Sequence, residues 1–177
     1  MSAGMVAPAA VRGEHVSSTI IRQCLINGDI LTANRLLGYG YIFSGTVVHG
    51  RAMGRKIGFP TANIRLSDPD KLIPKDGVYA AVCYLPSHSS LLTSHSSIIN
   101  YQLSILNSQI SSLVNIGTNP TVGGAERTIE AHLLDFEGDI YGSDIRCSLV
   151  RRIRDERRFD SLEDLQKQIT EDMQKVR

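Results

Sequence analysis

The spacing of hydrophobic residues predicts helices near both ends of the chain and strands between them. Near the amino terminus, apolar side chains recur every three or four positions in two short segments, as they do on one face of a helix. Ser17 or Ser18 can cap the first helix, and Asp29 can cap the second. Gly28 and Gly38 follow the last apolar positions and are expected to end the two helices. The pair holds too little apolar area to form a domain by itself.

The middle of the chain changes to short segments that are rich in β-branched residues and bounded by turn residues. In the last of them, Ile145, Cys147 and Leu149 alternate with polar residues, as in a strand with one buried face. Six segments are expected to be strands: 44–49, 78–85, 98–105, 113–116, 128–135 and 145–153. Because helices do not separate most of them, we predict a mostly β protein with a closed or nearly closed antiparallel barrel.

The carboxyl-terminal part returns to a helical pattern. Residues 160–164 contain a capping residue followed three positions later by an acidic residue, which is the capping-box signature. A hydrophobic stripe at helical spacing follows, formed by Leu162, Leu165, Ile169, Met173 and Val176. We expect this stripe to pack on the barrel. Residues 1–15 are expected to be a disordered lead, and the serine-rich residues 86–96 an exposed, poorly ordered hairpin tip.

Composition narrows the possible functions. The 177 residues carry a formal net charge of +1, so the chain lacks the basic field that attracts nucleic acid. Aromatic residues make up only 6%, which leaves little surface on which bases could stack. The three cysteines form no Cys-x-x-Cys pair, as is usual in a reducing cytosol. Because the sequence also lacks a long apolar run and a recognisable signal peptide, we expect a cytoplasmic protein without nucleic-acid or membrane partners.

Candidate chemistry is concentrated in one glycine-rich, basic loop. Gly50, Gly54 and Gly58 recur along this loop, and Arg55 and Lys56 lie between the last two of them. Glycines let the backbone approach a ligand closely, and successive backbone N–H groups in such a loop form a concavity that binds anions. The two cations would strengthen the attraction for phosphate.

The loop ends in Pro60-Thr61-Ala62-Asn63, which supplies a hydroxyl and an amide carbonyl. Such neutral oxygens suit Mg²⁺, which retains several waters and completes its coordination shell with substrate phosphates. A solvated basic turn is the alternative interpretation of a loop with this composition. Because polar residues are so concentrated where the loop ends, we favour a nucleotide phosphate site.

A carboxylate on one predicted strand is the second candidate. Ile129, Ala131 and Leu133 alternate with Glu130 and His132, so the two polar side chains are expected on the face opposite to the apolar one. A glutamate on the surface needs no special explanation, because exposed glutamates are the rule. From the alternation alone, Glu130 is therefore interpreted as a surface residue.

Several motifs together resemble the riboflavin kinase (flavokinase) family. The loop reads Gly45-x-Val47-x-x-Gly50 and then Gly54-Arg55-x-x-Gly58-Phe59-Pro60-Thr61-Ala62-Asn63, which is similar to the nucleotide-binding signature of that family. Further blocks follow in the family's order: Asp76-Gly77-Val78-Tyr79-Ala80, Asn115-Ile116-Gly117-Thr118-Asn119-Pro120-Thr121, Glu130-Ala131-His132, Asp139-Ile140-Tyr141-Gly142 and residues 154–162. The resemblance covers the chain from Tyr41 to its carboxyl terminus.

Residues 16–40 resemble the end of the adenylyltransferase module of bacterial bifunctional flavin synthetases. The rest of that module, including its His-x-Gly-His element, is absent from the sequence, so we expect no FMN adenylyltransferase activity from this chain alone. The resemblance implies three parts: the lead at 1–15, a helical remnant at 16–40 and a riboflavin kinase domain at 41–177. It also implies that the barrel is a six-stranded Greek key with a carboxyl-terminal helix.

The resemblance further implies ATP-dependent phosphorylation of the 5′-hydroxyl of riboflavin, which yields FMN and ADP. Glu130 would be the general base, and Mg²⁺ would be held at Thr61 and Asn63. The nucleotide would be bound by Gly50, Gly54, Arg55, Lys56, Gly58, Pro60, Thr61 and Asn63. The flavin would be bound by Asn115, Arg154, Arg157 and Phe159. We expect the isolated domain to be a monomer.

Some of these assignments have structural alternatives. Asn115 and Asn119 are also common turn residues. Phe159 could equally be the hydrophobic staple of the last helix. His132 is interpreted as a supporting or structural residue rather than a catalyst.

Two alternatives for the whole function also remain. One is a flavin- or nucleotide-binding barrel without turnover, and the presence of Thr61, Asn63 and Glu130 argues against it. The other is a nucleic-acid-binding barrel that uses the basic loop, and the nearly neutral charge and few aromatic residues argue against that.

Overall fold

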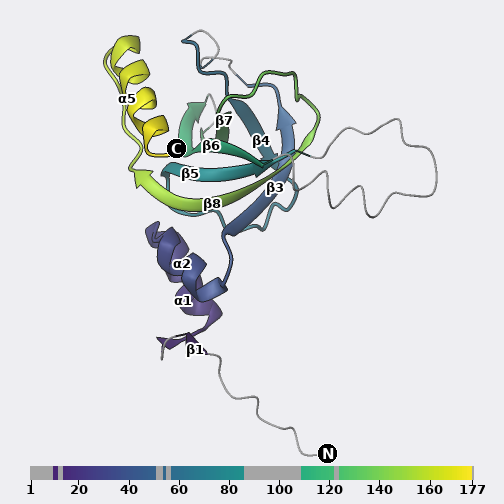
Figure 1. Cartoon of the computed structure of the whole chain (residues 1–177), viewed down its shortest axis with the longest axis vertical. Coiled ribbons are helices and arrows are strands. Elements are labelled where there is room, and N and C mark those ends of the chain that lie inside the picture. Colours follow the sequence, from purple (N-terminus) through teal and green to yellow (C-terminus); the bar gives the residue numbers. More distant parts are fainter. Residues whose placement is uncertain are drawn as a thin grey trace, which may run out of the picture.

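Six antiparallel strands close into a barrel in the computed structural model of the chain (Figure 1). Around the barrel the strands follow the order β3-β4-β7-β6-β5-β8. Their bounds are Tyr41–Val48 (β3), Ala62–Leu66 (β4), Gly77–Tyr84 (β5), Gln109–Thr121 (β6), Gly124–Leu133 (β7) and Asp144–Arg154 (β8). The structure describes residues 10–11, 14–50, 54, 57–85, 109–121 and 124–176. The predicted mostly β fold is confirmed.

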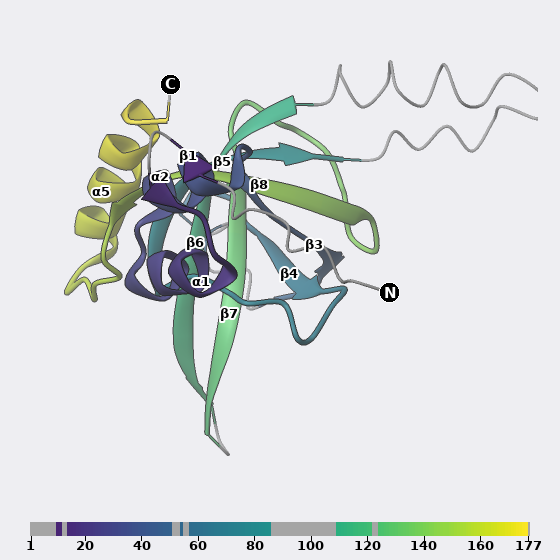
Figure 2. The same ribbon diagram turned by 90° about the horizontal axis from the view of Figure 1, so that it is seen from below.

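The connectivity of the strands gives the barrel a Greek-key arrangement. β5, β6 and β7 follow one another as neighbours, and β8 returns to pair with β5. β3 then closes the barrel between β4 and β8, so each of the six strands has a partner on both sides. Figure 2 shows β6 and β7 side by side as a long hairpin, paired from Ser112↔Leu133 to Thr121↔Gly124.

One of the six strands, β4, was not predicted from the sequence, and the other five differ from their predicted bounds, most of all β6, for which only 113–116 was predicted. The predicted strand 98–105 lies outside the described residues, whereas β4 was expected only as the end of the glycine-rich loop. β4 is five residues long and pairs with β3 and β7. Its inward-facing residues are Ala62 and Ile64, and the polar Asn63 stands between them. Two buried side chains are too short a pattern to distinguish a strand from a loop.

Alternate side chains of the strands point into the barrel and form its core. Phe43, Tyr79, Ile116, Ala131 and Leu149 are among the residues that are almost completely buried there. Burial of apolar surface stabilises a fold by about 25 cal/mol per Å². The inward faces of the strands therefore form the core, and their outward faces can bear polar side chains without loss of packing.

Two short helices lie below the barrel in Figure 1: α1 (Ser18–Asn27) and α2 (Ile30–Leu37). Both helices begin at the predicted caps. The side chains of Ser17 and Asp29 each accept a hydrogen bond from the backbone N–H three residues further on. They end at Gly28 and Gly38, with φ angles of 80° and 81°. These angles are in the left-handed region, which favours glycine.

Hydrogen bonds and shared core packing attach both helices to the barrel. Asn34 Nδ2 donates to the carbonyl oxygen of Leu149 at 2.8 Å, and Asn34 Oδ1 accepts from the backbone N–H of Tyr41 at 2.7 Å. The backbone N–H of Lys75 donates to the carbonyl oxygen of Leu25 at 3.0 Å. Buried residues of both helices belong to the same cluster as the barrel core. The pair is therefore packed on the barrel.

Part of the predicted disordered lead at 1–15 is described. Two strands of two residues each, Ala10–Val11 (β1) and Glu14–His15 (β2), pair antiparallel. The rest of the lead lies outside the described residues, and so does the predicted hairpin tip at 86–96.

The carboxyl-terminal helix α5 spans Leu162–Gln174, and Ser161 caps it by accepting a hydrogen bond from the backbone N–H of Asp164 at 3.0 Å. This agrees with the predicted capping signature. The second half of the hydrophobic stripe packs on the barrel, where Ile169, Met173 and Val176 meet Val78, Leu113 and Leu134. The beginning of the stripe does not pack in the same way, because Leu162 is 54% exposed.

A buried carboxylate also attaches α5 to the barrel. The side chain of Asp172 is 1% exposed, and its Oδ2 accepts a hydrogen bond from Arg154 Nε at 2.7 Å. Its Oδ1 accepts from Gln168 Nε2 at 3.0 Å, and Lys175 Nζ lies 3.6 Å from the same oxygen. A buried charge is tolerated when it is paired and hydrogen-bonded, and here the partners come from both the barrel and the helix.

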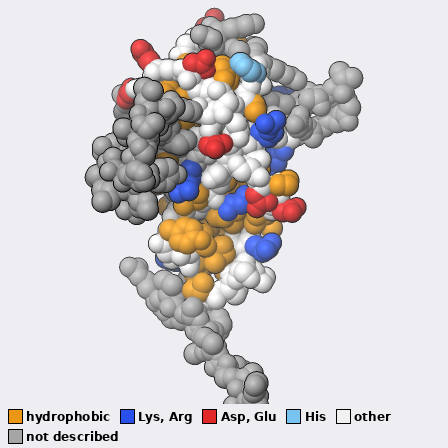
Figure 3. All heavy atoms as spheres, turned by 90° about the vertical axis from the view of Figure 1, so that its right-hand side faces the viewer, with side chains coloured by type: hydrophobic (Ala, Val, Ile, Leu, Met, Phe, Trp, Pro, Cys, Tyr) orange, Lys and Arg blue, Asp and Glu red, His pale blue; other side chains and the backbone are white. Residues whose placement is uncertain are grey.

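The surface carries charges of both signs. On the face shown in Figure 3, basic and acidic side chains are intermingled, and hydrophobic side chains gather in the lower part. Within the part of the chain that the structure describes, none of the helices is both long enough and apolar enough to cross a membrane.

We predict that Asp172→Ala lowers the free energy of unfolding by about 2 kcal/mol, because it leaves the partly buried guanidinium of Arg154 without its partner. Urea denaturation would measure this change. Lys167→Ala removes an exposed charged side chain from the same helix and should change the free energy of unfolding by less than about 0.5 kcal/mol. Equal effects of the two substitutions would contradict a special role of Asp172.

Candidate active site

The strand register brings residues from five strands into one row on the outer face of the barrel. Asn63 on β4 pairs with Glu130 on β7, and Glu130 also pairs with Asn115 on β6. The row continues through Val78 on β5 to Arg154 on β8. The core side chains that alternate with this row point inward, so the row itself points outward. Four of its five members were predicted as site residues from distant parts of the sequence.

A cavity of about 320 Å³ lies between this row and α5, and we call it the helix cavity. Its polar lining includes Thr61, Asn115, Glu130, His132, Arg154 and Arg157. Its apolar lining includes Ile57, Phe59, Leu113, Phe159, Leu165 and Ile169. All four residues predicted to bind flavin line this cavity. The first half of the helical stripe therefore faces a cavity, which differs from the expectation that the whole stripe packs on the barrel.

A second cavity, of about 410 Å³, adjoins the start of β4, and we call it the loop cavity. It is lined by Val47, Pro60, Thr61, Ala62, Ala131, Leu133 and residues 136–141. Val47, Ala131 and Leu133 belong to the barrel core, so this cavity reaches the inner face of the sheet. Thr61 lines both cavities. The start of β4 therefore separates a cavity on the inner side from one on the outer side.

A direct hydrogen bond joins the predicted general base to a residue predicted to bind the nucleotide and the metal. Thr61 Oγ1 donates to Glu130 Oε2 at 3.2 Å, and both side chains are half-buried. Glu130 was expected on the surface from alternation alone. Its position against α5 instead places the carboxylate inside the lining of the helix cavity. A carboxylate in this position can accept a proton from a group that is bound there.

Each of the three glycines in the loop is required for a different structural reason. At Gly50 a Cβ would lie 2.0 Å from Asn63 Nδ2, so glycine lets the Asn63 amide pack on the backbone. At Gly54 a Cβ would lie 2.2 Å from the carbonyl oxygen of Phe59. Gly58 has a φ of 80°, which glycine adopts at little cost. The predicted cations Arg55 and Lys56 lie outside the described residues.

His132 supports the end of the glycine-rich loop. Its Nδ1 is 2.8 Å from the carbonyl oxygen of Pro60, and because a carbonyl only accepts, Nδ1 is the donor. The ring of Phe59 meets the imidazole edge to face at 5.7 Å between centroids. Gln166 Nε2 of α5 donates to the carbonyl oxygen of Ile57 at 3.0 Å. The loop end is thus held from both β7 and α5.

Two guanidinium groups lie near one aromatic ring in the lining of the helix cavity. The guanidinium carbon of Arg157 is 4.5 Å from the ring centroid of Phe159, and that of Arg154 is 5.7 Å away. Arg154 is also the ion-pair partner of Asp172. The position of Arg154 can therefore be explained by its role in the fold as well as by ligand binding.

The residues of the loop cavity that follow β7 were not predicted as site residues. Phe136, Ile140 and Tyr141 give this cavity much of its apolar lining. Tyr141 also stacks on His49 at 3.8 Å between ring centroids, which ties this turn to the end of β3. The block Asp139-Ile140-Tyr141-Gly142 was noted as a motif without a site role. The available signal was an aromatic residue inside a turn that resembles a family motif.

A barrel with two adjoining cavities, with a hydroxyl that lines both of them and a carboxylate that lines one, has the features of an enzyme active site. Comparison of the sequence with known protein families identifies the family. The family described as "Flavokinase: Riboflavin kinase" matches residues 37–177, so the chain belongs to the riboflavin kinase family.

One curated relative agrees with this membership, and one solved structure shares the fold. The bifunctional riboflavin kinase/FMN adenylyltransferase of Escherichia coli (strain K12) is 39% identical over 160 residues, which are 90% of this chain and 44% of that protein. A crystal structure described as the macrolide-efflux protein from Streptococcus pneumoniae superimposes with a TM-score of 0.78 and 33% identity, covering 96% of this chain and 49% of that one. The chain spans about half the length of the curated relatives that it matches.

A further relative bears on the predicted absence of nucleic-acid partners. The protein named "RNA-binding riboflavin kinase RibR" from Bacillus subtilis (strain 168) is 42% identical over 133 residues, which are 75% of this chain and 48% of that protein. The name attributes RNA binding to that relative. The comparisons therefore give no support to our prediction that this chain has no nucleic-acid partner.

Proposed function

We propose that this chain transfers the γ-phosphoryl group of ATP to the 5′-hydroxyl of riboflavin, which gives FMN and ADP. Membership of the riboflavin kinase family supports this reaction. The observation that carries the proposal is the position of Thr61, which lines both cavities and donates a hydrogen bond to Glu130. A donor and an acceptor bound in the two cavities would meet at these two side chains.

We assign riboflavin to the helix cavity. Its apolar lining suits the flat, largely apolar ring system, and the guanidinium groups beside Phe159 suit the edges of that ring, which carry carbonyl oxygens. Asn115 and Glu130 adjoin each other on β6 and β7 and offer hydrogen-bond partners for the ribityl hydroxyls. The 5′-hydroxyl would lie against Glu130.

We assign the nucleotide to the loop cavity. Phe136 and Tyr141 give this cavity an aromatic lining that suits a purine base. Pro60 and Thr61 line it and directly follow the glycine-rich loop in the sequence, so the phosphates would extend toward Gly50 and Gly58. Gly54, which was also predicted to bind the nucleotide, lines the helix cavity. The cations expected at these phosphates, Arg55 and Lys56, follow Gly54 directly in the sequence.

The reaction requires positioning, charge neutralisation and removal of one proton. Glu130 would accept the proton of the 5′-hydroxyl as that oxygen bonds to the γ-phosphorus. The bond between the γ-phosphorus and the β–γ bridging oxygen then breaks, and ADP leaves with that oxygen. The hydroxyl of Thr61 would orient the Glu130 carboxylate for the proton transfer.

A divalent cation fits the oxygen-bearing side chains beside the loop. Thr61 Oγ1 and Asn63 Oδ1 are neutral oxygens, and Asn63 is the cross-strand partner of Glu130. Magnesium prefers such oxygens together with phosphate oxygens and water. The cation supplies charge neutralisation for the phosphates when it is bound, and Thr61 and Asn63 would hold it. Among the described residues there is no cluster of three or more His, Cys, Asp or Glu that could hold a metal alone.

We further propose that residues 41–177 form the kinase domain and that residues 16–40 correspond to the end of an adenylyltransferase module. The family match supports the first boundary, because it begins at residue 37. The relatives named as bifunctional enzymes extend over about twice this length, and we expect no FMN adenylyltransferase activity from residues 1–177.

We predict that the purified chain forms FMN from riboflavin with Mg²⁺ and ATP. Chromatographic separation of the fluorescent flavins would measure the product. A folded protein that binds riboflavin but forms no FMN would favour the alternative of a binding barrel without turnover. Replacing ATP with CTP in the same assay would measure the preference for the nucleotide.

We predict that Glu130→Gln lowers kcat about 10²-fold and leaves riboflavin binding nearly unchanged, because the amide keeps the shape but cannot take the proton. Steady-state kinetics and a flavin fluorescence titration would measure the two effects. Glu171→Gln changes a carboxylate on α5 that lines neither cavity and should leave kcat unchanged. Turnover of Glu130→Gln close to that of the wild type would remove Glu130 from the role of base.

We predict that Thr61→Ala raises the concentrations of ATP and Mg²⁺ needed for half-maximal rate by about tenfold, because one ligand oxygen of the cation is lost. Titration of each component at saturating riboflavin would measure this. Thr46→Ala is the matched control, since Thr46 also donates to a carboxylate, that of Asp144, but lines neither cavity. An unchanged dependence on Mg²⁺ would contradict the assignment of Thr61.

A further inference from the structure

We propose that Asp155 is a positioning residue for the acceptor substrate. Through its ion pair with Arg152, it holds the segment 155–159 against the helix cavity. This inference rests on the proposed assignment of that cavity to riboflavin. Asp155 itself does not line the cavity, so it would act through the residues that follow it.

The segment 155–159 needs side-chain anchors because it has no regular secondary structure. It joins the end of β8 to the cap of α5 and contributes Glu156, Arg157 and Phe159 to the cavity lining. Asp155 Oδ1 accepts a hydrogen bond from Arg152 Nη2 at 2.7 Å, and Lys75 Nζ lies 3.5 Å from the same oxygen. The hydrogen bond and positive charge of Arg152, together with the charge of Lys75, lower the pKa of the Asp155 carboxyl. The anchor is therefore ionised at neutral pH.

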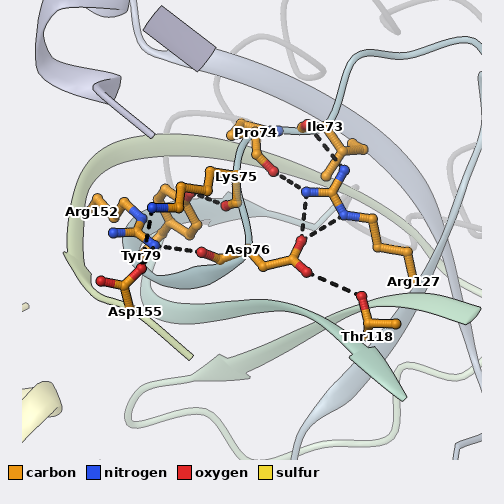
Figure 4. Close-up of polar contacts among 9 residues, drawn as sticks. All are labelled: Ile73, Pro74, Lys75, Asp76, Tyr79, Thr118, Arg127, Arg152 and Asp155. Carbon is orange, nitrogen blue, oxygen red and sulfur yellow. Dashed lines mark hydrogen bonds and ion pairs between the residues drawn. The ribbon is translucent and has the colours of Figure 1, made fainter. Parts of the chain in front are cut away.

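Arg152 is a fixed partner rather than a mobile surface side chain. Figure 4 shows its guanidinium between Asp155 and the backbone of Asp76, to whose carbonyl oxygen Nη2 also donates. A Cβ on Gly28, the residue that ends α1, would lie 2.8 Å from Arg152 Cδ, so the stem of the arginine packs on that glycine. The Arg152 side chain is 18% exposed, whereas that of Asp155 is 72% exposed.

Asp76 connects this anchor to the long hairpin of the barrel. Its carboxylate accepts hydrogen bonds from Arg127 Nε on β7 at 2.8 Å and from Thr118 Oγ1 on β6 at 3.1 Å (Figure 4). The backbone position to which Arg152 is bonded is thus fixed by two further strands. Asp155 is therefore held, through Arg152, by a network that includes four of the six barrel strands or their immediate ends.

The rest of the segment is held by contacts within the cavity. The Glu156 carboxylate lies over Gly117, where a Cβ would be 2.0 Å from Oε1. Phe159 is held beside Arg154 and Arg157. Substituting any of these cavity residues would change the ligand contacts directly. Asp155 offers a substitution that changes the position of the segment without replacing any side chain of the cavity lining.

An exposed ion pair contributes little to global stability. Its effect here is to order a segment before the ligand binds, and pre-ordering increases affinity because less conformational entropy is lost on binding. We therefore expect the loss of Asp155 to weaken riboflavin binding while the melting temperature stays nearly constant. The chemical step should be unaffected, because Thr61, which directly precedes β4, and Glu130 on β7 lie outside this segment.

The test compares Asp155→Ala with Asp144→Ala, which removes an exposed carboxylate from the other end of β8. We expect Asp155→Ala to raise the KM for riboflavin about fivefold, with kcat and the KM for ATP changed less than about twofold. Asp155→Asn retains an acceptor oxygen for Arg152 and should give an intermediate KM. Asp144→Ala should resemble the wild type. An unchanged KM for riboflavin in Asp155→Ala, or a fall in kcat alone, would overturn the proposal.

Hydrogen exchange separates this inference from the proposed kinase function. The backbone amides of residues 155–160 should exchange faster in Asp155→Ala than in the wild type, whereas those of β5 and β6 should not change. This measurement needs no substrate. If the wild type forms no FMN, the kinase function fails, and unchanged exchange at 155–160 separately overturns the anchoring role.

Discussion

The register of the barrel strands is the constraint on which the rest of the structure depends. Side chains on a strand alternate between the two faces of the sheet, so a shift of one residue between β7 and its neighbours would exchange the Glu130 face with the core face. The closed barrel excludes that shift, because Ile129 and Ala131 must fill the interior on either side of Glu130. Core packing thus places the polar row on the outer face.

The helix cavity exists because α5 is attached along only part of its length. The second half of its stripe packs on the barrel, and the buried Asp172 joins the helix to Arg154 at the end of β8. The first half stands away from the barrel, and Leu162 remains exposed there. The loop end is tied to the same helix through Gln166 and Ile57. Contacts that stabilise the fold therefore also set the width of the proposed riboflavin site.

Local signals in the sequence predicted the caps at Ser17 and Asp29 and the closed barrel, because these depend on short patterns. β4 was missed because its two buried side chains give too weak an alternation. The motifs singled out Asn115, Glu130 and Arg154, but their common row depends on strand pairing between distant segments, which one sequence does not contain. The turn that contains Tyr141 was recognised as a motif. Its position beside the loop cavity could not be predicted, because that position depends on how distant segments fold together.

The central claim is that the two substrates occupy separate cavities and meet between Thr61 and Glu130. A crystal structure of the protein with riboflavin, Mg²⁺ and a non-hydrolysable ATP analogue tests this most directly. We predict the flavin ring in the helix cavity, the base in the loop cavity, and the 5′-hydroxyl within hydrogen-bond distance, about 2.6–3.2 Å, of the Glu130 carboxylate. A riboflavin bound outside the helix cavity, or a 5′-hydroxyl directed away from Glu130 with both ligands in place, would contradict the account.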